Sequence, residues 1–262
     1  MILRPLEPPP AESAEFLPAW SVVERLERQS REFNGGCWMI TQPSHAALAG
    51  EFAAKISLPQ APRLEAALVR GIALHDAGWG VPDAQAIMQS RSVNKGAPRS
   101  FVDCSANEFL FAWEKSIDIA ASAGAAGGYI VSRHFYRLAE QRLAHGSGSD
   151  SDADTARLAR FLEDESRRQG QLAAKQEHSP EELETFTEVL QFCDLLSLYV
   201  CCGARDPAEF PEYFGARIRL SVDGETYKLD PPALESGAEF QVAALRHPAI
   251  AGLSGQELTI RF

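Results

Sequence analysis

The chain has 262 residues, of which 45% are apolar and 23% are charged, and its formal net charge is −11 at pH 7. This length and composition are sufficient for a large hydrophobic core and exclude a chain that is disordered throughout. The acidic balance excludes broad binding to nucleic acid or to anionic membranes. It permits a small anionic substrate where a metal ion or a few basic residues reverse the local charge.

The sequence also bears on the compartment. The uncharged stretch from Ile119 to Ser132 has only 14 residues and is rich in glycine and alanine, whereas a membrane-spanning helix needs about 20 mainly apolar residues. The N-terminal segment carries prolines and acids in place of the apolar core of a signal peptide. The five cysteines form no CxxC pattern and are interpreted as reduced thiols. We therefore expect a cytoplasmic protein without a membrane segment.

The first half of the chain alternates helix and strand signals. The proline-rich start is expected to be irregular apart from a short helix at Trp20–Arg31. Cys37–Thr41 is short and apolar, which predicts a strand. Ser44 is the expected N-cap of the next helix. Pro62 is expected to open the helix after that, and Gly78 to end it.

Residues 78–107 show no sustained apolar period and are predicted to form a long loop. Helical spacing then resumes in four segments, Glu108–Ala121, Tyr129–His145, Thr155–Gln176 and Pro180–Cys202. The polar run His145–Asp154 is interpreted as a connector.

The character of the sequence changes after Gly203. Asp223-Gly224 predicts a β-hairpin turn, and Phe240–Leu245 and Glu257–Phe262 are further strand candidates. The segments together predict a mainly α protein. We expect an irregular lead-in over residues 1–36, a helical domain over 37–203, and a small β appendage over 204–262 packed on the same domain.

Three of the six histidines, His45, His75 and His134, fall on the apolar side of predicted helices. A single histidine in such a place is more often a core residue than a ligand, but three in one helical domain favour a site. Asp194 lies in an otherwise uncharged helical stretch. Burying an unpaired carboxylate is costly, so a basic side chain or a metal ion is expected beside it.

His75 and Asp76 are adjacent in the last turn before a glycine, where a helix can unwind and its negative end favours a cation. With His45 and Asp194 they make a set of two imidazoles and two carboxylates. Such a mixed set suits Zn, Mn, Fe or Ni without selecting among them.

The order His, then His-Asp, then Asp on successive helices resembles the HD-domain superfamily of metal-dependent phosphohydrolases. The flanking sequence is similar to an uncharacterised bacterial branch, domain of unknown function 3891. The similar segments are QPSHAALAG at 42–50, HDAGW at 75–79, GAPRSF at 96–101, Ser132-Arg133-His134, and CDLLSL around Asp194. This resemblance covers about residues 37–203 of the printed sequence.

The resemblance implies an HD-domain-like helical bundle in which His45, His75, Asp76 and Asp194 ligate a metal. One divalent ion is expected and a second is possible, since His134 is the only further histidine expected inside and a full second site needs another ligand. In that arrangement His134 lies beside the ligands or faces the substrate.

The function implied is that of a metal-dependent hydrolase, in which the ion activates water for attack on a small phosphoester. Asp76 and His134 are the candidate catalytic residues, with His134 protonating the leaving oxygen or binding the phosphate. The candidate substrate-binding residues are Lys95, Arg99, Arg133 and Trp79. The basic ones could equally be solvated surface charges, and the tryptophan a core residue.

Two other interpretations stay open. The chain could be a sensor module that binds a metal or ligand in the same pocket without turnover. It could also be a structural helical protein whose histidines are coincidental, and that alternative predicts no bound metal. The expected partner is a small anionic substrate, with no nucleic acid and no membrane. The sequence leaves the oligomeric state open.

Overall fold

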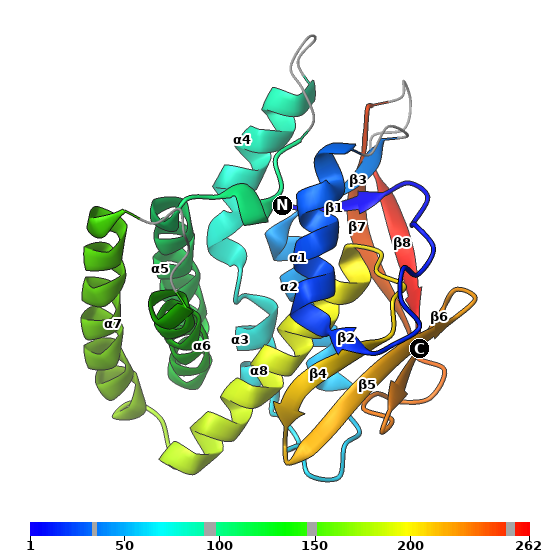
Figure 1. The fold of residues 1–262 in the computed structure, drawn as a ribbon. Coiled ribbons are helices and arrows are strands. Elements are labelled where there is room, and N and C mark those ends of the chain that lie inside the picture. Colours follow the sequence, from blue (N-terminus) through cyan, green and yellow to red (C-terminus); the bar gives the residue numbers. More distant parts are fainter. Residues whose placement is uncertain (33–35, 92–97, 146–150, 250–254) are drawn as a thin grey trace.

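The structure is a computed structural model that describes residues 1–32, 36–91, 98–145, 151–249 and 255–262 (Figure 1). Its helices are α1 Ala19–Gln29, α2 Gln42–Ala54, α3 Ala66–Ala73, α4 Gly80–Arg91, α5 Ala106–Ala123, α6 Ala125–His145, α7 Asp152–Ala173 and α8 Pro180–Cys201. Its strands are β1 Ile2–Pro5, β2 Leu17–Pro18, β3 Cys37–Ile40, β4 Ala208–Tyr213, β5 Ala216–Asp223, β6 Thr226–Asp230, β7 Glu239–His247 and β8 Gln256–Arg261. Short 3₁₀ turns lie at Ser30–Glu32 (η1), Ala77–Trp79 (η2) and Phe101–Asp103 (η3).

The strands form one eight-stranded mixed sheet in the order β1-β3-β7-β8-β6-β5-β4-β2. The β2–β4 and β6–β8 pairs are parallel and the others are antiparallel. The expectation of a mainly α, all-helical bundle with a small C-terminal β appendage is therefore wrong, and the fold is α/β. The physical reason is that β1 and β3, from the start of the chain, extend the C-terminal sheet through the β3–β7 pair.

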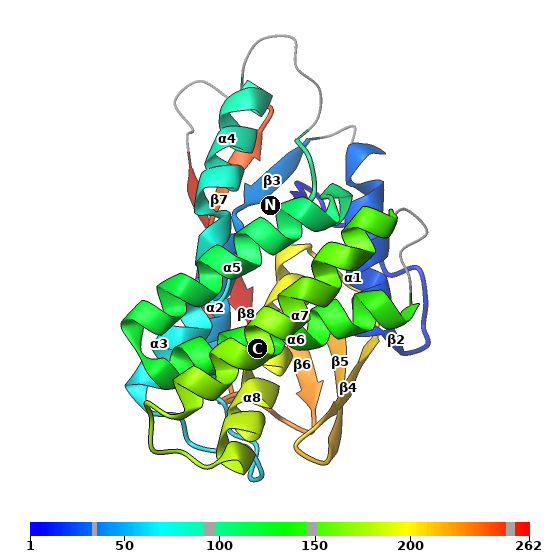
Figure 2. The same ribbon diagram turned by 90° about the vertical axis from the view of Figure 1, so that its left-hand side faces the viewer.

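The helices cover the sheet in layers (Figure 1). α5, α6 and α7 form a group on the side away from the sheet, and α2 and α8 lie between that group and the strands. The view turned by 90° agrees, with α5, α6 and α7 in front and the strands behind (Figure 2). α2 packs against β7, and α8 packs against β1 and β4. Among the described residues, no helix is long and apolar enough to cross a membrane.

The helices α5, α7 and α8 begin at signals that their sequences carry. Ser105, Ser151 and Ser179 each accept a hydrogen bond from the backbone three residues on, and the acidic residue there bonds back. Such capping boxes satisfy two backbone donors that a helix start leaves free. The predictions of these helices, of the first short helix and of the strand at Cys37 are confirmed, with bounds that differ by a few residues.

Three details of the prediction are wrong. The N-cap of α2 is Thr41, whose hydroxyl accepts from the Ser44 backbone N–H, so the helix starts earlier than expected. α3 starts at Ala66, beyond Pro62. Part of the predicted loop over 78–107 is α4, a helix that projects from the body of the molecule (Figure 1). Because Val81 and Met88 of α4 are exposed, this helix lacks the apolar period by which buried faces are predicted.

Tight contacts fix the helices on one another and on the sheet. A methyl group at Gly71 of α3 would lie 2.6 Å from the Gly127 Cα of α6, so these backbones touch where neither residue has a side chain. Phe52 of α2 is fully buried and packs edge-on against Phe240 of β7, with ring centroids 4.7 Å apart. This aromatic pair joins the central helix layer to the sheet.

Candidate metal centre

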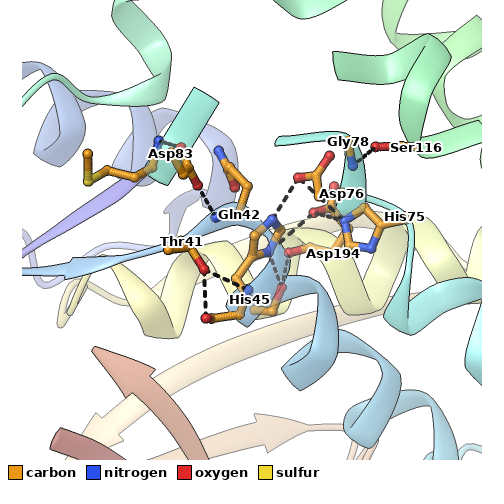
Figure 3. Close-up of polar contacts among 12 residues, drawn as sticks. Thr41, Gln42, His45, His75, Asp76, Gly78, Asp83, Ser116 and Asp194 are labelled. Atoms are coloured by element: carbon orange, nitrogen blue, oxygen red, sulfur yellow. Dashed lines mark hydrogen bonds and ion pairs between the residues drawn. The ribbon is translucent and has the colours of Figure 1, made fainter. Parts of the chain in front are cut away.

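Four elements bring five of the predicted site residues together. His45 comes from α2, His75 and Asp76 from the turn between α3 and η2, His134 from α6, and Asp194 from α8. His45, His75, Asp76 and Asp194 converge at the centre of the molecule, where these elements meet (Figure 3). The three imidazoles are 0–2% exposed, whereas the Asp76 and Asp194 side chains are 11% and 14% exposed.

Carboxylate oxygens and imidazole nitrogens face each other at short range. The Oδ2 of Asp76 lies 2.8 Å from His45 Nε2 and 3.8 Å from His75 Nε2. The Oδ1 of Asp194 lies 3.2 Å from His75 Nε2. One donor atom from each of His45, His75 and Asp194 falls within 4.8 Å of the other two. This spacing allows one ion to be reached by all three residues, with Asp76 adjacent.

Neighbouring acceptors fix which nitrogen of each ligand imidazole carries hydrogen. His75 Nδ1 lies 2.8 Å from the Ile72 carbonyl, which can only accept, so Nδ1 carries the hydrogen. The Ser197 hydroxyl donates to the Asp194 carbonyl at 2.8 Å and therefore accepts from His45 Nδ1 at 2.9 Å. His45 thus presents Nε2 to Asp76, and His75 presents Nε2 to both carboxylates. Asp194 Oδ1 approaches His45 at Nδ1, at 3.8 Å. Histidines that bind metals are typically oriented in this way by a hydrogen bond from their other nitrogen.

The ionisation of the cluster follows from these contacts. Burial lowers the pKa of His75, but the Asp76 and Asp194 carboxylates and the Ile72 carbonyl raise it further, to about 9. Burial raises the pKa of Asp194, but the hydrogen bond from His75 and the charges of the three histidines lower it to about 2. Without a metal ion, His75 is therefore an imidazolium paired with an ionised Asp194 at neutral pH.

The His134 ring packs edge-on against His75, with ring centroids 5.8 Å apart, but its hydrogen bonding differs from that of the other two histidines. Its Nε2 lies 3.5 Å from Asp194 Oδ2, and its buried Nδ1 has no hydrogen-bond partner among the described residues. Burial lowers its pKa to about 4, and the charges of His75 and Arg137 act in the same direction. His134 is therefore a neutral imidazole with one nitrogen available to a water molecule, an ion or a substrate.

A close contact with α5 positions the turn that carries His75 and Asp76. The Gly78 N–H donates to the Ser116 hydroxyl at 2.9 Å. A methyl group at Gly78 would lie only 2.1 Å from the Ala112 carbonyl oxygen. Glycine therefore allows η2 to pack directly against the α5 backbone. This contact positions the turn that carries His75 and Asp76.

Three of the predicted substrate-binding residues contact partners other than the cluster. Lys95 falls outside the described residues. Arg99 is exposed and pairs with Glu108 at 2.7 Å, and Arg133 pairs with Glu184 at 2.8 Å. Trp79 is 3% exposed and packs edge-on against Phe109. No hydrogen bond or ion pair joins these last three side chains to the cluster within the described ranges, so their binding roles stay predictions.

The structure adds three residues that the sequence did not suggest. Ser197 orients His45, while Arg137 and Gln191 meet beside the cluster, where the Arg137 Nη1 donates to Gln191 Oε1 at 2.5 Å. Each lies three residues from a predicted site residue, which is one turn along the same helix. That spacing is the signal by which they could have been found.

Comparison with known proteins gives a family and no activity. A family model described as "protein of unknown function (DUF3891)" matches residues 30–242. No curated protein and no solved structure matches the chain. The match spans both the helices that carry the cluster and much of the sheet.

Proposed function

We propose that this chain, which belongs to the DUF3891 family, is a metal-dependent hydrolase that acts on a small phosphoester. The observation that carries the proposal is the buried donor set of His45, His75 and Asp194, with Asp76 beside it. His45 Nε2 faces Asp76, and His75 Nε2 faces both Asp76 and Asp194 in a buried place. A divalent cation could be reached by His45, His75 and Asp194, with Asp76 beside it. The order of these four residues along the sequence resembles that in the HD-domain superfamily.

The donor chemistry fits a first-row transition metal. Imidazole nitrogen together with carboxylate oxygen suits Zn, Mn, Fe or Ni. The Ile72 carbonyl and the Ser197 hydroxyl hold the two imidazoles with Nε2 facing inward. A divalent ion, when bound, would lower the pKa of a coordinated water and polarise a phosphoryl oxygen. We expect one ion, and the free Nδ1 of His134 supports a second only if another ligand is supplied.

Two features support reaction rather than storage of the metal. Asp76 and Asp194 keep a partial exposure that the three imidazoles lack, so the carboxylate side of the cluster is the side open to a substrate. His134 is neutral; its Nε2 lies 3.5 Å from Asp194 Oδ2, and its Nδ1 has no partner among the described residues. Its lowered pKa favours accepting a proton or a hydrogen bond from water or substrate at neutral pH, in preference to donating a proton from an imidazolium.

We further propose a cytoplasmic location and a small anionic substrate, with no nucleic acid or membrane as partner. All five cysteines are free thiols, which supports a reducing compartment. The net charge of −11 supports the exclusion of nucleic acid.

Elemental analysis of the purified protein tests the metal. We expect about one equivalent of a transition metal in the wild type, its loss in His75→Ala, and its retention in His178→Ala. His178 is a matched control because its ring packs on Phe186 and contacts Glu65. Equal metal content in all three proteins, or none after reconstitution, would contradict the ligand set.

Turnover is tested separately with the metal-loaded protein and a broad panel of phosphoesters. Hydrolysis that is lost in His134→Ala, with the metal retained, supports the proposal. Metal binding without hydrolysis of any panel member would favour the sensor module instead.

A further inference from the structure

Arg137 and Gln191 form a contact one helical turn away from the cluster. Arg137 follows His134 by three residues on α6, and Gln191 precedes Asp194 by three residues on α8. The Arg137–Gln191 hydrogen bond of 2.5 Å therefore lies beside the approach of His134 to Asp194. Three residues of helix rise about 4.5 Å, so Arg137 and Gln191 start from backbone positions close to those of His134 and Asp194.

The charges around Arg137 leave it able to bind an anion. Its Nη2 contacts Glu184, and Arg133 donates to the same carboxylate at 2.8 Å, so two guanidinium groups share one carboxylate. The nearby Glu188 carboxylate accepts from the Phe214 backbone N–H. A guanidinium has five N–H donors, and the described residues engage two of those on Arg137.

Burial makes this guanidinium different from a surface charge. The Arg137 side chain is 24% exposed and is held by both Glu184 and Gln191. Arg99, by comparison, is 47% exposed in a surface pair with Glu108. Hydrogen bonds from a partly buried, held guanidinium to phosphate oxygens are stronger than those of a mobile surface arginine.

We infer that Arg137 binds a phosphate oxygen of the substrate beside the metal cluster, and that Gln191 positions its guanidinium for this contact. The inference rests on the proposed function, because it assumes that the substrate sits at the cluster. It assigns the anion contact to Arg137 rather than to the basic residues that the sequence suggested, Lys95, Arg99 and Arg133.

The test is a calorimetric titration of the full, metal-loaded chain with inorganic phosphate. We expect Arg137→Gln to weaken phosphate binding at least tenfold while the metal content stays unchanged. Arg137→Lys should restore part of the affinity, because a lysine keeps the charge without the paired donors. Arg219→Gln is the matched control, since it also removes an arginine from a pair with a glutamate, here Glu209, and it should bind phosphate as the wild type does.

A second variant guards against misfolding. Gln191→Ala keeps the charge of Arg137 but removes the hydrogen-bond acceptor that positions its guanidinium. We expect phosphate affinity to fall several fold with an unchanged melting temperature. Phosphate affinity that is the same in Arg137→Gln and in the wild type overturns the inference, as does a metal-loaded wild type that binds no phosphate. Elemental analysis of the same samples separates the two proposals, because absence of metal from the wild type is a failure of the proposed function.

Discussion

Metal binding to this protein should depend steeply on pH, and His75 is the reason. Its Nδ1 is held by the Ile72 carbonyl, and its Nε2 lies 3.2 Å from Asp194 Oδ1. In the ion-free protein, this Nε2 carries the proton that pairs with Asp194. A metal ion that takes the same nitrogen must first displace that proton.

The magnitude follows from the pKa of about 9 for His75. At pH 7 the proton occupies Nε2 almost completely, so the apparent metal affinity is about a hundredfold below its value above pH 9. Between pH 6.5 and 8.5 the affinity should therefore rise about tenfold per pH unit, with release of about one proton per ion. Asp194, with a pKa of about 2, is ionised throughout this range and adds nothing to the slope.

Isothermal titration of the ion-free protein with Mn²⁺ measures both quantities. Titrations at pH 6.5, 7.5 and 8.5, each in two buffers of different ionisation enthalpy, give the affinity and the number of protons released. The His178→Ala variant should show the same slope as the wild type. An affinity that is constant over these three pH values, or binding without proton release, would refute the view that His75 Nε2 is a protonated ligand.

Three further predictions concern packing and burial. Gly78→Ala places a methyl group 2.1 Å from the Ala112 carbonyl oxygen. We expect the free energy of urea unfolding to fall by about 1–3 kcal/mol and the metal content to be reduced. Wild-type values of both quantities would contradict the contact. Glu27 is fully buried, and burial raises its pKa to about 8, although bonds from Ser100 and Leu3 oppose this. The free energy of unfolding therefore falls as pH rises from 4.5 towards 8. Glu27→Gln should remove up to about 4 kcal/mol of the difference between the free energies of urea unfolding measured at pH 5 and at pH 8. Phe52→Ala should cost about 3–5 kcal/mol in the same assay, and a loss below about 1 kcal/mol would show that α2 is not anchored on the sheet through this ring.

The sequence predicted the elements whose signals are local. α5, α7 and α8 have serine caps followed three residues later by an acid, and their apolar spacing is regular because one face of each is buried. β1 and β4 were missed because each is short and contains proline. β1 is also defined by β3, a partner distant in sequence, whereas β4 pairs with its neighbour β5. Pairing with a strand distant in sequence produces no periodic pattern of apolar residues in the strand itself.

The candidate site was predicted in part for a similar reason. His45, the His75-Asp76 pair and Asp194 stand out as polar residues in apolar surroundings, and the structure brings them within contact distance of one another. Ser197 does not stand out, since a serine in a buried helix is common. Its role depends on how α2 packs against α8, which no single stretch of sequence reveals.

The sheet takes part in holding the site together. His45 and Asp194 lie on α2 and α8, and both helices rest on strands: α2 on β7 through Phe52 and Phe240, and α8 on β1 and β4. The distance between the two helices, and so between His45 and Asp194, is therefore set partly by the strands beneath them. Because the donor atoms must stay within a few ångströms to share an ion, weakening a helix–sheet contact should lower metal affinity even where every ligand is intact. The β layer therefore belongs to the same folding unit as the candidate metal centre, and damage to either should appear in both.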